Sequence, residues 1–328
     1  MRNMLIVLIP LFILGGQLKL SGQACCTGGA PISTNLGVQS FQANQLVLDV
    51  SYDYNSLRDL YAASKNLHDS RRTRTIKTLF LRGSYGIDKN WSISVILPYL
   101  WQEQVIRSDF GRINQNTEGI GDLVILAQRT LINNHKNQLL IAAGPKLPTG
   151  SISQKDDEFG ILLAPDLQPG TGSWDGIGAL SYSRFGLFTP TTNIYGLLTY
   201  RYSFEQDRND GQQKYRFGNE LALNLGISYS FQVKTWSINP SLHYRYRSSQ
   251  SDENDGFDFP NTGGDWMYLV PGIRINSPKG VIIHSSFEIP LHTDVTGTQL
   301  VTSQKWNIGI TYPINLKKDK AFRIKYGK

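Results

Sequence analysis

Residues 217–231 read FGNELALNLGISYSF, and this stretch decides the fold. Most of its odd positions carry large apolar side chains, including Leu221, Leu225 and Ile227, whereas its even positions carry small or polar ones. A period of two is typical of a β-strand whose two faces meet different surroundings. Lipid outside and a polar lumen inside would produce this pattern, so the stretch predicts one strand of a transmembrane β-barrel.

The same alternation recurs along the chain, while helical periodicity is nearly absent. We therefore expect an all-β protein, a single antiparallel transmembrane barrel of about twelve strands, with alternately long and short gaps. Long extracellular loops and short periplasmic turns would produce those gaps. The expected strands cover residues 45–54, 74–87, 91–102, 122–132, 138–146, 174–184, 193–204, 217–231, 236–247, 266–276, 281–291 and 304–314. Residues 321–326 also alternate, so the closing strand lies either there or at 304–314.

The N-terminus predicts export. Arg2 precedes an apolar run over residues 5–14, and small residues lead to Ala24, so residues 1–24 read as a cleaved signal peptide. No later run is long enough for a membrane-spanning helix. Because only helices and closed barrels satisfy their backbone in lipid, we expect the mature chain in a bacterial outer membrane. Its expected partners are outer-membrane lipids, the barrel-assembly machinery and a small solute.

The remaining divisions follow from this plan. Residues 25–44 form a segment before the barrel, residues 45–316 form the barrel, and residues 317–328 form a basic tail. The net charge is +7, and six basic residues against Asp319 make the tail a large part of it. A basic tail can indicate nucleic acid, but export argues against that partner, so we interpret it as a solvated tail.

The chain offers little for metals, cofactors or catalysis. Cys25 and Cys26 are its only cysteines, and they lie at the expected mature N-terminus. They are interpreted as an exposed pair, with acylation of Cys25 or metal binding as alternatives. The acidic stretch 252–258 could hold calcium, but it lacks the spacing of an EF-hand loop. No GxSxG or HExxH motif occurs, so we expect neither an enzyme nor a cofactor.

Aromatic residues lie near the ends of the expected strands. Trp91 and Trp236 follow short turns, and a second set lies beside long gaps: Trp101, Tyr246, Trp266 and Tyr268. Such positions predict two aromatic girdles at the membrane interfaces.

If the apolar face of each strand meets lipid, the opposite face lines the lumen. A hydrated solute path is one interpretation of its polar residues; a salt-bridged interior that fills a narrow barrel is the other. The candidate lumen residues are Asp49, Asp53, Arg201, Arg216, Glu220, Asn224, Asn239, His243, Arg245, Arg247, His284 and Glu288.

Three glycine-rich motifs carry a family resemblance. Residues 119–123 (GIGDL), 144–150 (GPKLPTG) and 170–175 (GTGSWD) resemble the signature of the barrels of the MetA pathway of phenol degradation, within the wider group of fatty-acid-channel-like proteins. Residues 25–33 (CCTGGAPIS) resemble a Bacteroidetes-type transporter subgroup. The resemblance implies passive passage of small apolar or aromatic solutes. The alternative function is a non-transporting surface barrel whose loops mediate adhesion.

The motif residues themselves have two interpretations. They could contact solute, or they could only shape a loop, because glycine permits close backbone approach at strand ends. The residues concerned are Gly144, Pro148, Gly150, Gly170, Gly172 and Asp175.

The resemblance also bears on residues 25–44. In fatty-acid channels a segment before the first strand plugs the lumen, and a twelve-stranded barrel is narrow enough to be blocked by it. We expect residues 25–44 to enter the barrel near Arg216, Glu220, Arg245 and Arg247. A disordered periplasmic leader is the alternative.

Overall fold

A computed structural model describes residues 23–24, 36–69, 71–109, 111–157, 160–208 and 211–316. The predicted signal peptide up to residue 22, the Cys25–Cys26 pair and the basic tail lie outside the described residues. The two-residue β1 (Gln23–Ala24) pairs in parallel with β19. None of the helices in the described ranges is long and apolar enough to span a membrane.

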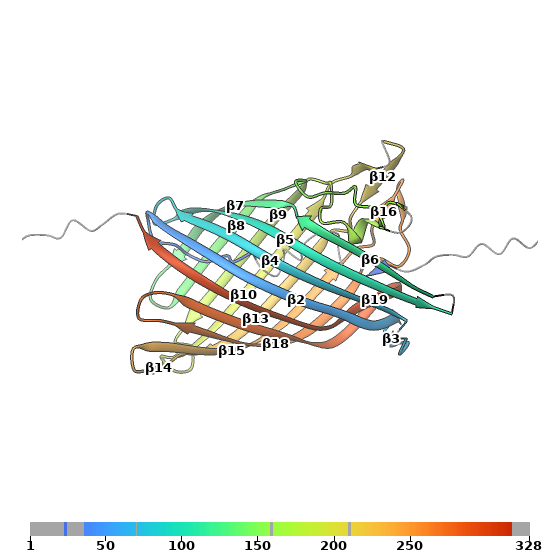
Figure 1. Cartoon of the computed structure of the whole chain (residues 1–328). Coiled ribbons are helices and arrows are strands. Elements are labelled where there is room, and N and C mark those ends of the chain that lie inside the picture. Colours follow the sequence, from blue (N-terminus) through green and yellow to red (C-terminus); the bar gives the residue numbers. More distant parts are fainter. Residues whose placement is uncertain are drawn as a thin grey trace, which may run out of the picture.

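One antiparallel sheet closes on itself to form the wall (Figure 1). Its strands alternate apolar residues outside with buried residues inside, as in β13, where exposed Leu221 lies between buried Glu220 and buried Ala222. The wall strands are β2 (Gln45–Ala63), β4 (Arg72–Gly86), β5 (Trp91–Ser108), β7 (Leu123–Asn133), β8 (Asn137–Leu147), β9 (Asp175–Phe185), β10 (Thr192–Ser203), β13 (Glu220–Tyr229), β15 (Trp236–Ser249), β18 (Gly264–Asn276) and β19 (Ile282–Asn315).

The last strand crosses the wall twice. The first part of β19 is antiparallel to β18, and the part after Val295 is antiparallel to β2. A closed ring in which every neighbour is antiparallel needs an even number of passes, so β19 must reverse its direction. Gly297, with φ 75°, lies where the pairing changes partner. The eleven strand elements therefore make twelve passes, which agrees with the expected barrel.

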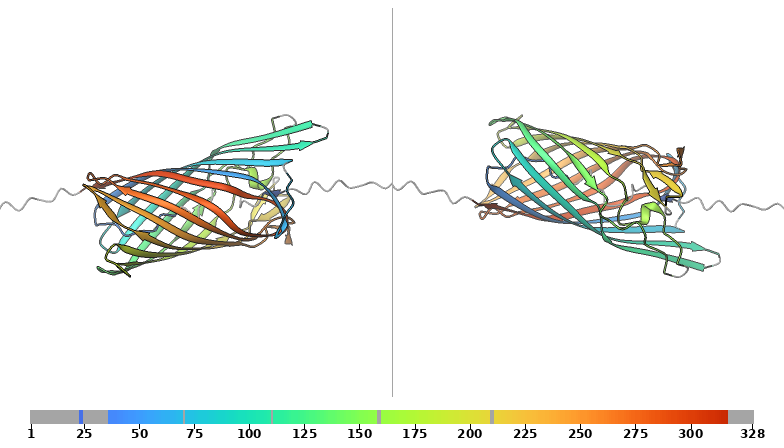
Figure 2. Two further views of the ribbon diagram at one scale, coloured as in Figure 1. Left: turned by 90° about the horizontal axis from the view of Figure 1, so that it is seen from below. Right: turned by 90° about the horizontal axis from the view of Figure 1, so that it is seen from above.

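Several expected gaps are strand instead. β2 and β4 continue through most of the first gap, and β5 pairs with β6 (Gly111–Ile120) through the next long one. Figure 2 shows the β5–β6 hairpin projecting beyond the rest of the barrel. The expected last gap, 292–303, also lies within β19. Strands extend past the apolar band because backbone pairing continues in water, where alternation is no longer required.

The two ends of the barrel differ. At one end, called the turn end, tight turns such as residues 87–90 join the strands. At the other, called the loop end, lie residues 148–157, 160–174, 204–208, 211–219 and 250–263. A small loop sheet at the loop end is formed by β11 (Gln206–Arg208), β12 (Gln213–Arg216), β16 (Glu253–Asn254) and β17 (Phe257–Asp258). The remaining short elements are β3 (Lys65–Asn66), β14 (Phe231–Val233) and the 3₁₀ turn η2 (Pro165–Leu167).

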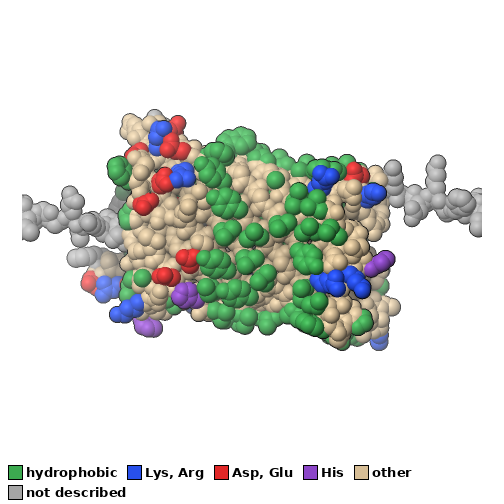
Figure 3. All heavy atoms as spheres, turned by 180° about the vertical axis from the view of Figure 1, so that it is seen from behind, with side chains coloured by type: hydrophobic (Ala, Val, Ile, Leu, Met, Phe, Trp, Pro, Cys, Tyr) green, Lys and Arg blue, Asp and Glu red, His purple; other side chains and the backbone are tan. Residues whose placement is uncertain are grey.

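The outer surface carries the expected apolar band. Figure 3 shows hydrophobic side chains over the middle of one face, with charged side chains gathered towards the two ends. Trp91 and Trp236 are exposed at the turn end, as the girdle prediction requires. Trp266 and Tyr268 contradict that prediction, because they face inward and are only 1% and 4% exposed. Trp266 faces inward because its ring stacks with Arg247 on the inner face of the wall. The Arg247 guanidinium carbon lies 4.7 Å from the Trp266 ring centroid.

Candidate functional site

Most of the predicted lumen residues lie on the inner face of the wall. Arg216 does not, and its placement in the lumen was wrong: it belongs to β12 of the loop sheet, where it pairs with Glu253. The inner residues, with their strands, are Asp49 and Asp53 on β2, Arg201 on β10, Glu220 and Asn224 on β13, Asn239, His243, Arg245 and Arg247 on β15, and His284 and Glu288 on β19.

An alternating chain of charges crosses half of the inner wall near the loop end. Asp122, immediately before β7, begins it, and one residue from each successive strand continues it with opposite sign. The nitrogen–oxygen distances are 2.9 Å for Lys146–Asp122, 2.9 Å for Lys146–Asp175, 3.2 Å for Arg201–Asp175, 4.0 Å for Arg201–Glu220 and 2.9 Å for Arg247–Glu220. Each charge is buried beside an opposite one, so their desolvation is compensated.

A second chain of the same kind continues on the other half. Arg245 pairs with Glu288, whose Oε1 also lies 3.2 Å from Lys305 Nζ. Lys305 in turn lies 3.5 Å from Asp53, which accepts a hydrogen bond from Asn307. Because adjacent strands supply residues of opposite sign, these charges largely neutralise one another and bind the strands together.

The three glycine-rich motifs meet at Asp122. Its carboxylate accepts hydrogen bonds from the Gly150 amide at 3.0 Å and from the Thr171 amide at 2.9 Å, as well as from Lys146. These contacts tie both ends of the segment 148–174, called here the crossing loop, to one point of the wall. The sequence interpretation in which the motifs shape a loop therefore has a direct geometric basis.

Glycine is required where the two ends of the crossing loop touch. A Cβ atom added to Gly150 would lie 2.5 Å from the Gly170 Cα, and one added to Gly170 would lie 2.4 Å from the Gly150 carbonyl carbon. No side chain fits between them. Among the other motif residues, Gly144 lies on β8, Pro148 directly follows that strand, Gly172 lies against Gln206, and Asp175 opens β9.

The crossing loop also contacts strands β4 and β5, which lie beyond β7 in the wall. Asp166 of η2 accepts a hydrogen bond from Arg74 of β4 at 2.7 Å, and the Arg74 guanidinium also donates to Gln102 of β5. The Leu167 carbonyl accepts from Gln102 at 3.2 Å and from Thr117 at 2.6 Å. Since β8 and β9 hold its ends and β4 to β6 hold its tip, the loop covers the part of the loop end between these strands.

Part of the inner wall is apolar, which the sequence interpretation missed. Strands β4 to β10 turn apolar side chains inward, and Leu36 and Val38 pack against them from inside the barrel. The inward residues are Phe80, Ile96, Leu100, Val124, Leu126, Leu140, Ala142, Ile177 and Leu197, called here the apolar arc. The signal was present as apolar runs on both strand faces, such as residues 95–97, but a search for alternation passes over such runs.

The segment before the barrel enters the lumen in its described part. Leu36 and Val38 are buried against the apolar arc, and Gly37 lies against the Arg82 guanidinium. These neighbours differ from the charged residues that the sequence suggested, because the apolar side chains of the segment pack on an apolar wall. Residues 25–35, the rest of this segment, lie outside the described residues.

The loop sheet is held by a buried acid. Asp252 accepts hydrogen bonds from the Tyr215 hydroxyl at 2.5 Å and from the Gly218 amide at 2.8 Å. Burial raises the pKa of Asp252, and burial next to Asp252 raises the pKa of Tyr215. Within the described ranges, no group of three or more His, Cys, Asp or Glu residues could hold a metal ion, including in the acidic stretch that was considered for calcium.

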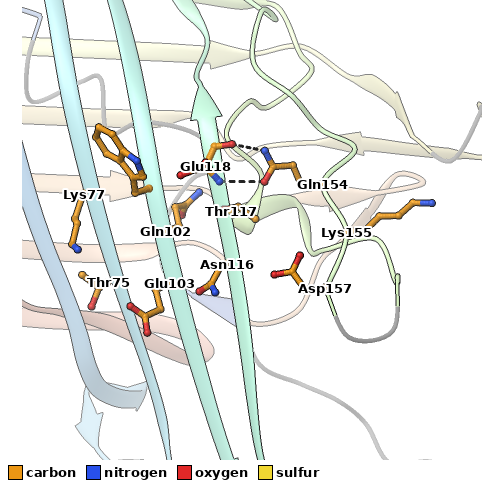
Figure 4. Close-up of a pocket in the computed structure, with 11 residues that line it drawn as sticks. Thr75, Lys77, Gln102, Glu103, Asn116, Thr117, Glu118, Gln154, Lys155 and Asp157 are labelled. Carbon is orange, nitrogen blue, oxygen red and sulfur yellow. Dashed lines mark hydrogen bonds between the residues drawn. The ribbon is translucent and has the colours of Figure 1, made fainter.

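A pocket of about 710 Å³ lies beside the β5–β6 hairpin (Figure 4). β6 has no strand on its outer edge; there the Gln154 side chain bonds the backbone of Glu118, whose amide donates to Gln154 Oε1 at 3.2 Å. The lining is polar and charged, including Lys77, Glu103 and Lys155, and holds none of the predicted site residues. We interpret it as a solvated recess between the hairpin and the crossing loop.

Comparison with known families identifies the barrel. A model of the family described as "Putative MetA-pathway of phenol degradation" matches residues 71–289. The chain belongs to this family. The match runs from β4 into β19 and includes all three motifs, so the resemblance seen in the sequence is confirmed. A search of curated proteins found no match.

Solved structures show the same fold. The outer-membrane channel of Pseudomonas putida F1 superposes with a TM-score of 0.66 at 13% identity, covering 85% of this chain and 98% of that one. The β domain of the Bordetella autotransporter BrkA reaches 0.46 at 10% identity, covering 83% and 100%. The Pseudomonas putida toluene transporter TodX reaches 0.41 at 9% identity, covering 90% and 96%. The first likeness shows the fold, and the two lower scores carry no further argument.

The apolar outer band, the closed ring and the family together make this chain an outer-membrane β-barrel. The crossing loop, the two chains of paired charges and the apolar arc are the features that any function of its lumen must use.

Proposed function

We propose that this protein is a passive outer-membrane channel for small apolar or aromatic solutes. The observation that carries the proposal is the mixed inner wall, in which the apolar arc on β4 to β10 lies beside two chains of paired charges that run from β7 round to β2. A barrel filled only for rigidity could use the paired charges alone. An apolar arc inside an exported barrel suits a solute that is poorly soluble in water.

Two coverings lie over this path and both are detachable. The crossing loop is tied to β4, β5 and β6 mainly through Arg74, Gln102 and Thr117, and residues 36–44 contact the apolar arc through a few side chains. Neither covering is part of the wall, so each can move without breaking strand pairing. We further propose that the short turns face the periplasm and the loop end faces outside.

The alternative is a surface barrel that does not transport. The projecting β5–β6 hairpin and the exposed aromatic residues Trp174 and Phe257 at the loop end favour it, because such features can bind a partner. The two functions make opposite predictions for the isolated protein in a membrane.

Solute-driven swelling of liposomes distinguishes the two functions. Liposomes that contain the refolded full chain should swell faster in small neutral solutes than liposomes without protein. Heat-modifiable migration on gels is the separate control that shows the barrel is folded. A folded barrel that leaves the swelling rate at the protein-free level would refute the channel.

A further inference from the structure

An accessible cation on the inner face of the wall has no counter-ion among the described residues. Arg274 of β18 alternates with the outward residues Ile273 and Ile275, and its side chain is exposed to the lumen. Within the described ranges no carboxylate forms an ion pair with it. This contrasts with Arg82 and Arg245, which pair with Asp49 and Glu288.

Several other basic groups surround Arg274 in the part of the lumen nearer the turn end. In the strand register Arg274 lies opposite Asn239 of β15 and His284 of β19. It is also close enough to influence the charge of Arg82, Tyr195 and His243. Arg245 acts on Tyr195 and His243 as well. Since Arg82 and Arg245 have acidic partners, Arg274 is the charge left over, and the field there favours an anion.

Tyr195 joins this basic cluster to the apolar arc. Its ring packs against the arc, and it lies 6.2 Å from the His243 ring in an edge-to-face arrangement. His243 itself lies directly over Gly226, where a Cβ atom would come within 2.1 Å of its Nδ1. Apolar side chains and a surplus positive charge thus meet at one place in the lumen.

We propose that this place binds a small organic anion, with its apolar body on the arc and its anionic group at Arg274. The proposal rests on the proposed channel function and specifies the class of solute. A ring or short alkyl body would lie against Leu197 and Tyr195, and a carboxylate or sulfonate would accept charge-assisted hydrogen bonds from the guanidinium.

Residues 36–38 now occupy the apolar part of that site. Leu36 and Val38 cover the arc, and Gly37 brings the backbone against Arg82. The segment supplies apolar side chains but no carboxylate, so it fills half of the site and leaves Arg274 without an anion. A solute with both parts would therefore compete with the segment for the arc.

Three probes of one size separate charge from apolar contact: benzenesulfonate, neutral benzenesulfonamide and the cation phenyltrimethylammonium. Binding to the full-length protein in neutral detergent is measured by equilibrium dialysis. Benzenesulfonate should bind more tightly than both other probes. Arg274→Gln should weaken its binding about 10- to 100-fold, as expected for losing a charge-assisted hydrogen bond. Arg274→Lys should restore part of it.

The matched control is Arg129→Gln, because Arg129 lies on the outer face over the Trp91 ring at 5.2 Å. It should leave benzenesulfonate binding unchanged. Equal binding of the three probes, or equal loss in both glutamine variants, would overturn the inference while liposome swelling still supported a channel. A barrel that binds benzenesulfonate through Arg274 but never swells liposomes would support the site and refute the channel.

Discussion

Lys146 Nζ lies 2.9 Å from Asp122 Oδ2 and also 2.9 Å from Asp175 Oδ2, and each of these side chains is at most 2% exposed. The lysine belongs to the second glycine-rich motif, and its two partners belong to the first and the third. One buried cation therefore fastens all three motifs and, through Asp122, both ends of the crossing loop.

Replacing this lysine should unfold the barrel more easily. Lys146→Met leaves Asp122 buried without a cation and Asp175 with Arg201 alone, and breaking a buried pair costs about 3–5 kcal/mol. We expect a clearly lower urea midpoint for refolded protein, measured by tryptophan fluorescence. Lys155→Met, in the exposed part of the crossing loop, is the control and should change little. Equal midpoints for Lys146→Met and the native chain would contradict the fastening role.

A charge on the lipid face should be costly in a different way. Leu225 of β13 is 48% exposed on the outer face, so Leu225→Arg places a cation in lipid at a cost of about 2–4 kcal/mol near the midplane. Folding efficiency into liposomes should fall accordingly. Asn224→Ser, one residue away on the inner face, should fold normally; the opposite ranking would reverse the assignment of faces.

Stability of the loop sheet should depend on pH through Asp252. Burial raises the pKa of this carboxyl above that of the unfolded chain, so the folded loop sheet favours the protonated acid. Its stability should therefore be highest at low pH and fall as pH rises from about 4, the ordinary value for Asp, through the raised pKa. Limited proteolysis of loop 250–263 should quicken along that range.

Asp252→Asn is the test of that assignment, since the amide keeps an acceptor for Tyr215 but has no charge to titrate. Proteolysis of this variant should be nearly independent of pH over the same range. If native chain and variant respond alike, the titrating group lies elsewhere.

The features that could be predicted from the sequence are those that contact with lipid imposes on it. Alternation such as Leu221 against Glu220 is forced wherever one face meets hydrocarbon, so strands, lumen charges and barrel class were predictable. β6 (Gly111–Ile120) was not, because both of its faces are polar in water and its pairing leaves no periodic trace. Trp266 was misplaced since position at a strand end does not reveal which face a ring takes.

The apolar arc shows a second limit of the pattern. Where both faces are apolar, as around Ile96, alternation disappears and a lining residue looks like a lipid contact. The ion pairs could not be predicted for another reason. Lys146 and Asp122 meet because of the register between neighbouring strands, and the spacing of residues along the chain does not reveal that register.

Removing the segment before the barrel should open the lumen. Deleting residues 27–40 takes away Leu36 and Val38, which cover the apolar arc, but keeps the first strand intact. Single-channel conductance in planar bilayers should rise above that of the full chain. A correctly folded deletion variant with unchanged conductance would show that the segment is no plug.

The most direct test of the solute path removes both coverings at once. Arg74→Gln releases the tip of the crossing loop from Asp166, and deletion of residues 27–40 uncovers the arc. Liposomes carrying the combined variant should swell faster in small neutral solutes than liposomes carrying either single change. If the combined variant is folded by gel mobility yet swells liposomes no faster than protein-free controls, the lumen is not a path and the account is contradicted.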